Sequence, residues 1–279
     1  MKDLSNENVI HIVKDGVQYL QFRRLLEYSD ILVHAYSLGI DKNFRTARAK
    51  TAEPITKEEF KEANKDYADL CNAIEMNYID AVKPNQAHTK NVKKVDEHVN
   101  INKPDFNLKE YDLTDGLITN KSNILLATTN ADCILLMFFD PVKKAIANVH
   151  SGWKGTLQRI SVETVEKMQK EYGSNSKDII CCICPSIRKC HFEVEKDVQT
   201  LFENEFKDLK LDEIIERKSE NKWLIDTVKI NEEILQKAGL KKENIIDCGI
   251  CSVCNSDLIH SYRVEKEKYG LSTAIIGLK

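Results

Sequence analysis

The sequence predicts an α/β (α+β) protein whose mixed β-sheet core is flanked by helices. Four apolar, strand-like runs follow one another between residues 116 and 149 and are joined by short turns. Segments with helical periodicity stand on either side of this block. Short turns join antiparallel neighbours, whereas parallel strands need long crossovers, so antiparallel or mixed pairing is expected rather than strict βαβ alternation.

Four helices are expected from apolar residues that recur every three or four positions. The first begins at the capping box Thr56-Lys-Glu-Glu59, the second ends near Gly173, and the fourth is capped by Asp226 or Thr227 and ends at Gly239. Their inward faces are predicted, in order, to be Phe60, Ala63, Tyr67, Leu70 and Ile74; Leu157, Ile160, Val165 and Met168; Val194, Val198, Leu201 and Phe202; and Ile230, Ile234 and Ala238.

Strands are expected at eight places. In chain order they are Gly116–Thr119, Ile124–Thr128, Ile134–Phe139, Ala145–Val149, Asp178–Ile183, Trp223–Ile225, Ile245–Asp247 and Thr273–Ile276.

The composition is that of an ordinary globular protein. Of 279 residues, 42% are apolar and 30% are charged, and the net charge of −3 gives no reason to expect nucleic acid or an anionic membrane as a partner. No apolar run reaches the roughly 20 residues that span a bilayer, and the N-terminus lacks the apolar region of a secretion signal. We therefore expect one cytoplasmic domain over residues 1–279, as a monomer or homodimer, whose nine cysteines are thiols or metal ligands rather than disulfides.

Candidate chemistry lies in two adjacent segments, Asn130-Ala-Asp-Cys133 and His150-Ser-Gly-Trp-Lys-Gly155. The apolar run 134–139 and a short turn separate them, so a hairpin would bring Cys133 beside His150. A third candidate, His88, needs the fold to bring it in. A thiolate and two imidazoles suit Zn²⁺ or copper, and three scattered ligands are typical of a catalytic metal site with one open position. Spacing alone leaves a buried cysteine with two structural histidines as the alternative.

Several motifs occur in an order that resembles the bacterial laccase-domain family, formerly described as multicopper polyphenol oxidoreductases and now regarded as purine nucleoside phosphorylases. The resemblance covers residues 30–279. Its motifs are Gln86-Ala-His88, Asp115-Gly-Leu-Ile-Thr119, Asn130-Ala-Asp-Cys133, His150-Ser-Gly-Trp-Lys-Gly155, Cys184-Pro-Ser-Ile187 with Cys190-His-Phe-Glu-Val194, Trp223-Leu-Ile-Asp226 with Asn231, and Ser261-Tyr-Arg263.

The resemblance implies a fold of the cytotoxic-necrotizing-factor-like cysteine hydrolase type, and metal ligands at His88, Cys133 and His150. It implies Zn²⁺ as cofactor, with Cu²⁺ as an alternative, and phosphorolysis of adenosine, inosine and methylthioadenosine. Adenosine deamination and copper-dependent phenol oxidation are implied as companion activities. Purine nucleosides and phosphate are then the partners, and Asp132 and His150 the catalytic residues, with Asp132 orienting a ligand.

Phosphate binding is expected at the turn 152–155, where backbone amides at a helix start and Lys154 can meet an anion. Trp153 is a candidate for stacking on the base. The segment His34-Ala-Tyr-Ser-Leu-Gly-Ile-Asp41 lacks the arginine and double glycine usual in the family, and Lys154 stands where the family commonly has arginine. Arg45, Arg48 and Arg263 are therefore predicted to compensate, with Arg263 in an intact motif.

The sequence leaves three alternatives to this function. A true laccase needs on the order of ten histidine ligands, and this chain has seven scattered histidines. A cysteine hydrolase or deamidase would use Cys133 as nucleophile and His150 as base. Finally, Cys248-x-x-Cys251-x-x-Cys254 has the spacing of iron–sulfur ligands, with Cys184-Pro185 as a remote fourth, so a cluster or a second zinc site is a rival use of these thiols.

Overall fold

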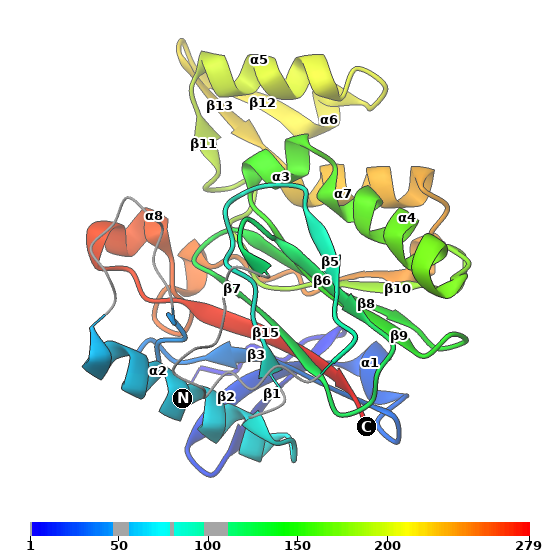
Figure 1. The fold of residues 1–279 in the computed structure, drawn as a ribbon. Helices are drawn as coiled ribbons and strands as arrows, with labels where there is room; N and C mark the ends of the chain where they lie inside the picture. The colour runs from blue at the N-terminus through cyan, green and yellow to red at the C-terminus, as the bar shows by residue number, and fades with distance from the viewer. Residues whose placement is uncertain (1, 47–55, 79–80, 98–110) are drawn as a thin grey trace.

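The computed structural model describes residues 2–46, 56–78, 81–97 and 111–279 (Figure 1). These residues form three sheets. The strand order of the first is β1 (Val9–Lys14), β2 (Val17–Phe22), β3 (Leu32–Leu38), β15 (Ser272–Leu278), β7 (Leu125–Asn130), β4 (Ala81–Val82). The second is β14 (Ile245–Asp247), β10 (Ile180–Ile183), β8 (Ile134–Asp140), β9 (Ala145–Ser151), β6 (Gly116–Thr119), β5 (Val92–Lys94). The third is β11 (Glu193–Val194), β13 (Lys222–Ile225), β12 (Ile215–Ser219).

Helices cover the outer faces of the sheets. They are α1 (Arg23–Leu26), α2 (Lys57–Ala73), α3 (Trp153–Leu157), α4 (Ile160–Tyr172), α5 (Lys196–Glu205), α6 (Leu211–Ile214), α7 (Thr227–Lys237) and α8 (Tyr262–Glu265). Most strand pairs are antiparallel, but β4–β7, β5–β6 and β10–β14 are parallel. The predicted mixed α/β architecture is confirmed.

The two large sheets pack face to face around a shared apolar core. Strand β8 shows why its uninterrupted apolar run is needed: Leu135, Met137 and Phe139 join the core between the sheets, whereas Ile134 and its alternate neighbours pack under the helices outside. A strand covered on both faces has no reason to alternate with polar residues. A polar bridge crosses this layer at Asn148, whose side-chain amide donates to the carbonyls of Leu126 and Ala274 in the other sheet.

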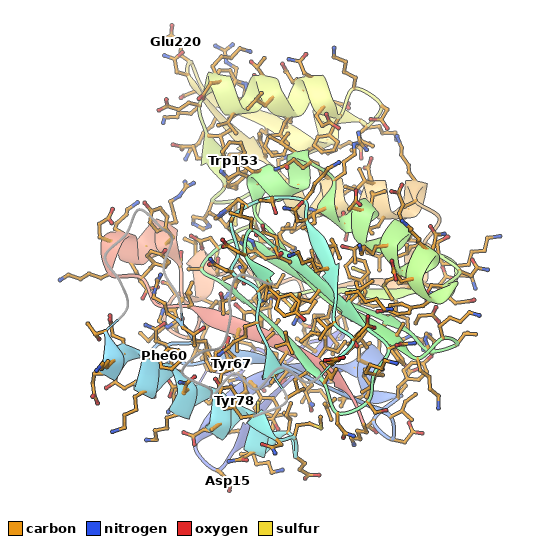
Figure 2. All side chains as sticks on the ribbon, in the orientation of Figure 1. Asp15, Phe60, Tyr67, Tyr78, Trp153 and Glu220 are labelled. Carbon is orange, nitrogen blue, oxygen red and sulfur yellow. The ribbon has the colours of Figure 1, made fainter. Side chains whose placement is uncertain are left out.

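Each large sheet carries its own helical layer. Helix α2 covers the outer face of the first sheet and α4 the outer face of the second. The predicted capping box of α2 is present, with Thr56 accepting the Glu59 amide. Tyr67 is fully buried and stacks on Tyr78 at 5.5 Å (Figure 2), whereas Phe60, expected to point inward, is 39% exposed because it lies in the first turn of the helix, beyond the sheet.

The third sheet forms a smaller layer above the second (Figure 1), where it packs on α5, α6 and α7 through Phe202, Phe206 and Ile225. The predicted second helix is broken: α3 ends before Arg159, which has a left-handed backbone (φ 56°), and α4 then runs to Gly173. Val194, expected on the third helix, belongs to strand β11, and Leu201 is 49% exposed.

Among the described residues, no helix is long and apolar enough to cross a membrane.

Candidate active site

The β8–β9 hairpin places a thiol and an imidazole side by side, as the sequence predicts. Cys133 directly precedes β8, and His150 lies on β9 opposite Leu135. Since strand pairing sets this register, the two side chains meet at the open end of the hairpin. His150 is buried and Cys133 is half-buried.

His88 reaches the same point from a separate loop. The side-chain amide of Gln86 donates to the Thr129 carbonyl and accepts the Thr129 amide, both at 2.8 Å, which ties this loop to strand β7. His88 itself has a positive φ of 58°, an unusual backbone for a residue with a side chain. The loop is therefore held in place by specific bonds rather than by its own preference.

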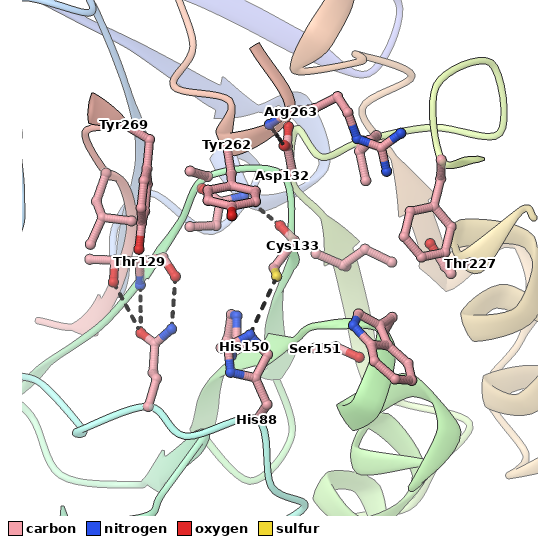
Figure 3. Close-up of a pocket in the computed structure, with 18 of the residues that line it drawn as sticks. His88, Thr129, Asp132, Cys133, His150, Ser151, Thr227, Tyr262, Arg263 and Tyr269 are labelled. Carbon is pink, nitrogen blue, oxygen red and sulfur yellow. Dashed lines mark hydrogen bonds between the residues drawn. The ribbon is translucent and has the colours of Figure 1, made fainter. Parts of the chain in front are cut away.

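The three predicted ligands converge (Figure 3). The Nε2 atom of His88 lies 3.9 Å from the Sγ atom of Cys133, and the His88 and His150 rings meet edge to face with centroids 4.9 Å apart. The ligand atoms of His88, Cys133 and His150 all lie within 4.8 Å of one another. Residues 45 and 17 positions apart in sequence thus form one group.

Asp115, directly before β6, holds the His150 imidazole and the backbone of the His88 loop. One carboxylate oxygen lies 2.8 Å from Nδ1 of His150, and the same carboxylate accepts the backbone amides of Ala87, His88 and Thr89. It is completely buried. Asp115 belongs to one of the sequence motifs, but the sequence does not indicate its role. Only the fold shows that this one carboxylate forms hydrogen bonds with two of the ligand residues.

The thiol and imidazole polarise each other. Burial by itself would raise the pKa of Cys133, but the charge of His150 and the hydrogen bonds from His150 and His88 together outweigh it and lower the thiol's pKa to about 6. Burial by itself would lower the pKa of His150, but Cys133 and Asp115 raise it to about 10. Cys133 is thus a thiolate at neutral pH, which is the form that binds metals or attacks electrophiles.

Gly152 makes room for the group. A β-carbon there would lie 2.7 Å from Cδ2 of His88 and 3.1 Å from Sγ of Cys133. Only glycine lets the chain turn from β9 into α3 beneath these side chains.

The group fits a bound metal ion. Nδ1 of His150 is held by Asp115, which leaves Nε2 as the free ring nitrogen, and a carboxylate behind a ligating imidazole is the usual arrangement around zinc. One sulfur and two ring nitrogens suit Zn²⁺ or copper.

A pocket of about 770 Å³ opens over the three ligands. Its size is that of a small-molecule site. Of the other residues predicted to act here, Asp132, Trp153, Arg45 and Arg263 line it. Lys154 is exposed and is not among the lining residues, and Arg48 lies outside the described residues.

The Asp132 carboxylate forms hydrogen bonds with neighbouring residues of the protein. It has a positive φ of 84°, and its carboxylate accepts the Ser252 hydroxyl at 2.6 Å and the Arg263 amide at 2.7 Å. These bonds fix the backbone immediately before Cys133, so Asp132 positions the thiolate through the chain.

Arg45 and Arg263 contribute positive charge to the lining of the pocket. The Arg263 guanidinium donates to the carbonyls of His191 and Glu193, at 3.0 and 3.2 Å, and that of Arg45 donates to the carbonyl of Tyr269 and lies over its ring. Carbonyls and rings orient a guanidinium without neutralising it. Helix α3, where phosphate binding was expected, has five residues, and the Lys154 ammonium lies over the Trp153 ring, 5.4 Å from its centroid.

Comparison with known proteins identifies the family of this chain. Residues 55–279 match the model of a family described as multi-copper polyphenol oxidoreductase laccase. The purine nucleoside phosphorylase YlmD of Bacillus subtilis is 34% identical over 166 residues, which is 60% of this chain and 59% of that protein. The purine nucleoside phosphorylase LACC1 of Homo sapiens is 31% identical over 175 residues, 61% of this chain and 40% of that one. The matched part of the chain thus spans less than two thirds of these relatives.

Solved structures share the fold. A crystal structure of Bacillus licheniformis hypothetical protein YfiH matches with a TM-score of 0.81 at 23% identity, covering 95% of this chain and all of that one. A crystal structure of YlmD from Geobacillus stearothermophilus matches with a TM-score of 0.80 at 19% identity, covering 97% and 99%.

Proposed function

This chain belongs to the family described as multi-copper polyphenol oxidoreductase laccase, and we propose that within it the protein is a purine nucleoside phosphorylase that uses a metal held by His88, Cys133 and His150. The observation that carries this proposal is the convergence of these three side chains on the floor of a pocket that two arginines also line. The names of the curated relatives support the same activity.

Zinc bound there would supply a Lewis acid with a coordination position left for water or substrate. The chain's own contribution is to hold the ligands ready. Asp115 fixes the His150 ring and the His88 backbone, and Gly152 leaves the space in which the ligands converge.

The pocket walls supply binding groups for both substrates. Trp153, Tyr262 and Tyr269 offer aromatic faces to a purine. Arg263 and Arg45, whose bonds are made to neutral acceptors, supply the positive charge for phosphate, and an arginine fork matches a phosphate better than the exposed Lys154. Glu193 in the same wall is already paired with Lys218.

In phosphorolysis, a phosphate oxygen bonds to ribose C1′ as the bond from C1′ to purine N9 breaks, and the purine leaves with a proton. Holding both reactants in one water-poor pocket removes much of the entropic barrier to this two-substrate step. Adenosine, inosine and methylthioadenosine all present a purine and a ribose carbon to these walls.

The assay is incubation with inosine and phosphate at about millimolar concentration, in the range of ordinary KM values. We expect hypoxanthine and ribose 1-phosphate in equal amounts, no turnover without phosphate, and none by Cys133→Ser. Intact inosine, adenosine and methylthioadenosine in the presence of zinc-loaded protein and phosphate would refute the proposal.

Companion activities belong to the same pocket. A metal that activates water there would deaminate adenosine to inosine without phosphate, and copper in place of zinc would support phenol oxidation. The product of an adenosine reaction run with and without phosphate separates deamination from phosphorolysis.

A second candidate is a cysteine hydrolase or deamidase. It would have the cytotoxic-necrotizing-factor-like fold type that the sequence resemblance implies. Its supporting observation is the order Cys133, His150, Asp115: a thiol with a pKa of about 6, a facing imidazole, and a buried carboxylate 2.8 Å behind it. This is the arrangement of a nucleophile, its base and an orienting acid. Activity that survives chelation and is abolished by iodoacetamide would favour it, whereas a metal-ligating thiolate resists alkylation until the metal is removed.

We regard residues 1–279 as one cytoplasmic domain acting as a monomer or homodimer. In support, the pocket draws its lining from Phe44 through Leu271, so its walls come from both large sheets and both ends of the described chain. Light scattering and limited proteolysis test these points.

A further inference from the structure

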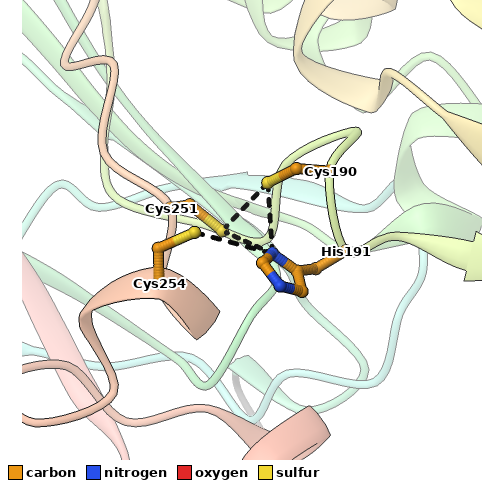
Figure 4. A group of neighbouring side chains, drawn as sticks. All are labelled: Cys190, His191, Cys251 and Cys254. Carbon is orange, nitrogen blue, oxygen red and sulfur yellow. Dashed lines mark hydrogen bonds between the residues drawn. The ribbon is translucent and has the colours of Figure 1, made fainter.

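A second group of metal-binding side chains lies beside the pocket. It consists of Cys190, His191, Cys251 and Cys254, and we call it the Cys3His cluster (Figure 4). Its four ligand atoms lie within 4.8 Å of one another. These four residues have no role in the proposed catalysis, and the names of the relatives do not refer to such a site.

The distances within the cluster are close to those of a tetrahedral metal site. With zinc–sulfur bonds of about 2.3 Å and zinc–nitrogen bonds of about 2.0 Å, tetrahedral geometry requires about 3.8 Å between sulfurs and about 3.5 Å between sulfur and nitrogen. The Sγ atoms of Cys190 and Cys251 are 3.7 Å apart. Nδ1 of His191 lies 3.7 Å from Sγ of Cys251 and 3.6 Å from Sγ of Cys254. The same nitrogen is closer, at 3.1 Å, to Sγ of the adjacent Cys190.

The fold prepares this arrangement from two distant segments. Parallel pairing of β10 with β14 sends both following segments out at the same end of the sheet. Beyond the strands, Ser186 donates its amide to Ile250 and accepts the amide of Ser252, and Arg188 forms an ion pair with Asp247. These bonds align residues 190–191 with residues 251–254 without using any of the four ligand atoms.

Three thiol sulfurs and one imidazole nitrogen are gathered at one point of the surface. Thiolates held this close repel one another, and a divalent cation placed between them relieves that repulsion.

We propose that the Cys3His cluster is a structural zinc site, separate from the pocket metal. Four protein ligands close the tetrahedron and leave no position for substrate, which is typical of structural zinc. Binding replaces the thiol protons with zinc and releases them to solvent. Cys190 and Cys254 are exposed, so the ion has a path to the site.

The zinc would brace one wall of the pocket. The carbonyl of the ligand His191 accepts Arg263, and Ser252, next to the ligand Cys251, donates to Asp132. Asp132 in turn accepts the Arg263 amide. Loss of this zinc should therefore loosen Arg263 and Asp132, whereas the bonds of Asp115 to His150 and to the His88 backbone should remain.

The iron–sulfur reading of the Cys248, Cys251 and Cys254 run is not what the structure assembles. Cys248 is buried, and its sulfur lies 3.6 Å from an Arg188 nitrogen and 3.5 Å from the Ile250 amide nitrogen, outside the cluster. Cys184 is buried in the core between the sheets. In the structure, Cys190 and His191 join Cys251 and Cys254, where the sequence spacing predicted Cys248 and Cys184.

Metal content tests the proposal. Full-length protein purified with a reductant and loaded with zinc should hold two ions per chain. Cys254→Ser and Cys190→Ser should each reduce this to one, Cys133→Ser should also reduce it to one, and Cys133→Ser/Cys254→Ser should hold none. Cys248→Ala is the matched control within the same run of cysteines and should retain two.

X-ray absorption on zinc-loaded Cys133→Ser, which keeps only the Cys3His cluster, identifies the ligands even if the other variants fold poorly. Three sulfurs and one nitrogen around zinc are expected. One zinc per wild-type chain that disappears with Cys133→Ser, or a Cys190–Cys251 disulfide in protein kept reduced, would overturn the proposal. These outcomes do not depend on nucleoside turnover.

Discussion

The carboxylate of Asp115 lies 2.8 Å from Nδ1 of His150 and at the same time accepts the amide of His88 at 3.0 Å. Two candidate ligands that are 62 residues apart are therefore oriented by one buried side chain. Such a group controls metal affinity without touching the metal, because it fixes the ring and the tautomer that present the ligand nitrogen.

Asp115→Asn should weaken zinc binding at the pocket by about 10- to 100-fold, the usual range for losing a carboxylate behind a ligating histidine. The amide would accept fewer of the loop's hydrogen bonds and cannot stabilise a charged imidazole. Competition with a chromogenic chelator measures the change. Asp140→Asn is the matched control: Asp140 is also fully buried, but it accepts the amides of the turn at the other end of the hairpin. Equal zinc affinity in Asp115→Asn and wild type would contradict the role of Asp115.

Gly152→Ala should lower zinc occupancy of the pocket at least about tenfold, a loss comparable to disturbing a ligand's support. Its β-carbon would lie 2.7 Å from the His88 ring, which must move away from Cys133. The nearby Gly155→Ala is the control, because there the nearest atom, on Ile160, is 3.4 Å away. Zinc titration of both variants checks this, and the steric account fails if they bind zinc equally well.

Arg263→Gln should raise the KM for phosphate by about tenfold, equivalent to losing about 1.4 kcal/mol of charge-assisted binding. The zinc content should not change, since Arg263 contacts no pocket ligand. Lys154→Ala should alter that KM by less than about twofold, as expected of an exposed charge outside the pocket. Initial rates at varied phosphate measure both values. A larger effect at Lys154 than at Arg263 would favour phosphate binding at the turn 152–155 instead.

The hairpin and its ligands could be predicted because they depend on local pattern. A continuous apolar run, a short turn and a second run determine which residues meet, and Cys133 and His150 follow from that pairing. The capping box of α2 was predictable for the same reason. Placing His88 required the family resemblance, because a separate loop brings it in.

Features that depend on long-range pairing could not be predicted. Strand β3 was not expected, since it is paired with β15 from the far end of the chain. The Cys3His cluster joins residues about 60 positions apart, and the sequence spacing pointed to the wrong partners for Cys251. Strands β1 and β2 are different, because they form a local hairpin through Asp15 and Gly16, and that turn signal was overlooked.

His34 should make the protein sensitive to acid. It lies on β3, is 1% exposed, and its Nε2 accepts the Phe22 amide at 2.7 Å. Burial lowers its pKa from 6.5 to about 3, outweighing the hydrogen bond. Above pH 6.5 the ring is neutral in both states and has no effect. As the pH falls from 6.5 towards 3 the unfolded chain binds a proton that the folded chain does not, so stability is lost by about 1.4 kcal/mol per pH unit.

Comparison with His34→Gln isolates this effect, because glutamine does not titrate. Both proteins carry the same metal ligands and carboxylates, so the other acid-sensitive contributions cancel in the difference. At pH 8 the variant should have a lower free energy of unfolding than wild type, because the substitution removes the buried His34 ring. The difference between the two free energies should shrink steadily as the pH falls from 6.5 to 4. Urea unfolding at several pH values gives the two free energies. Parallel curves across this range would show that His34 is protonated in the folded protein and would contradict the pKa assigned to it.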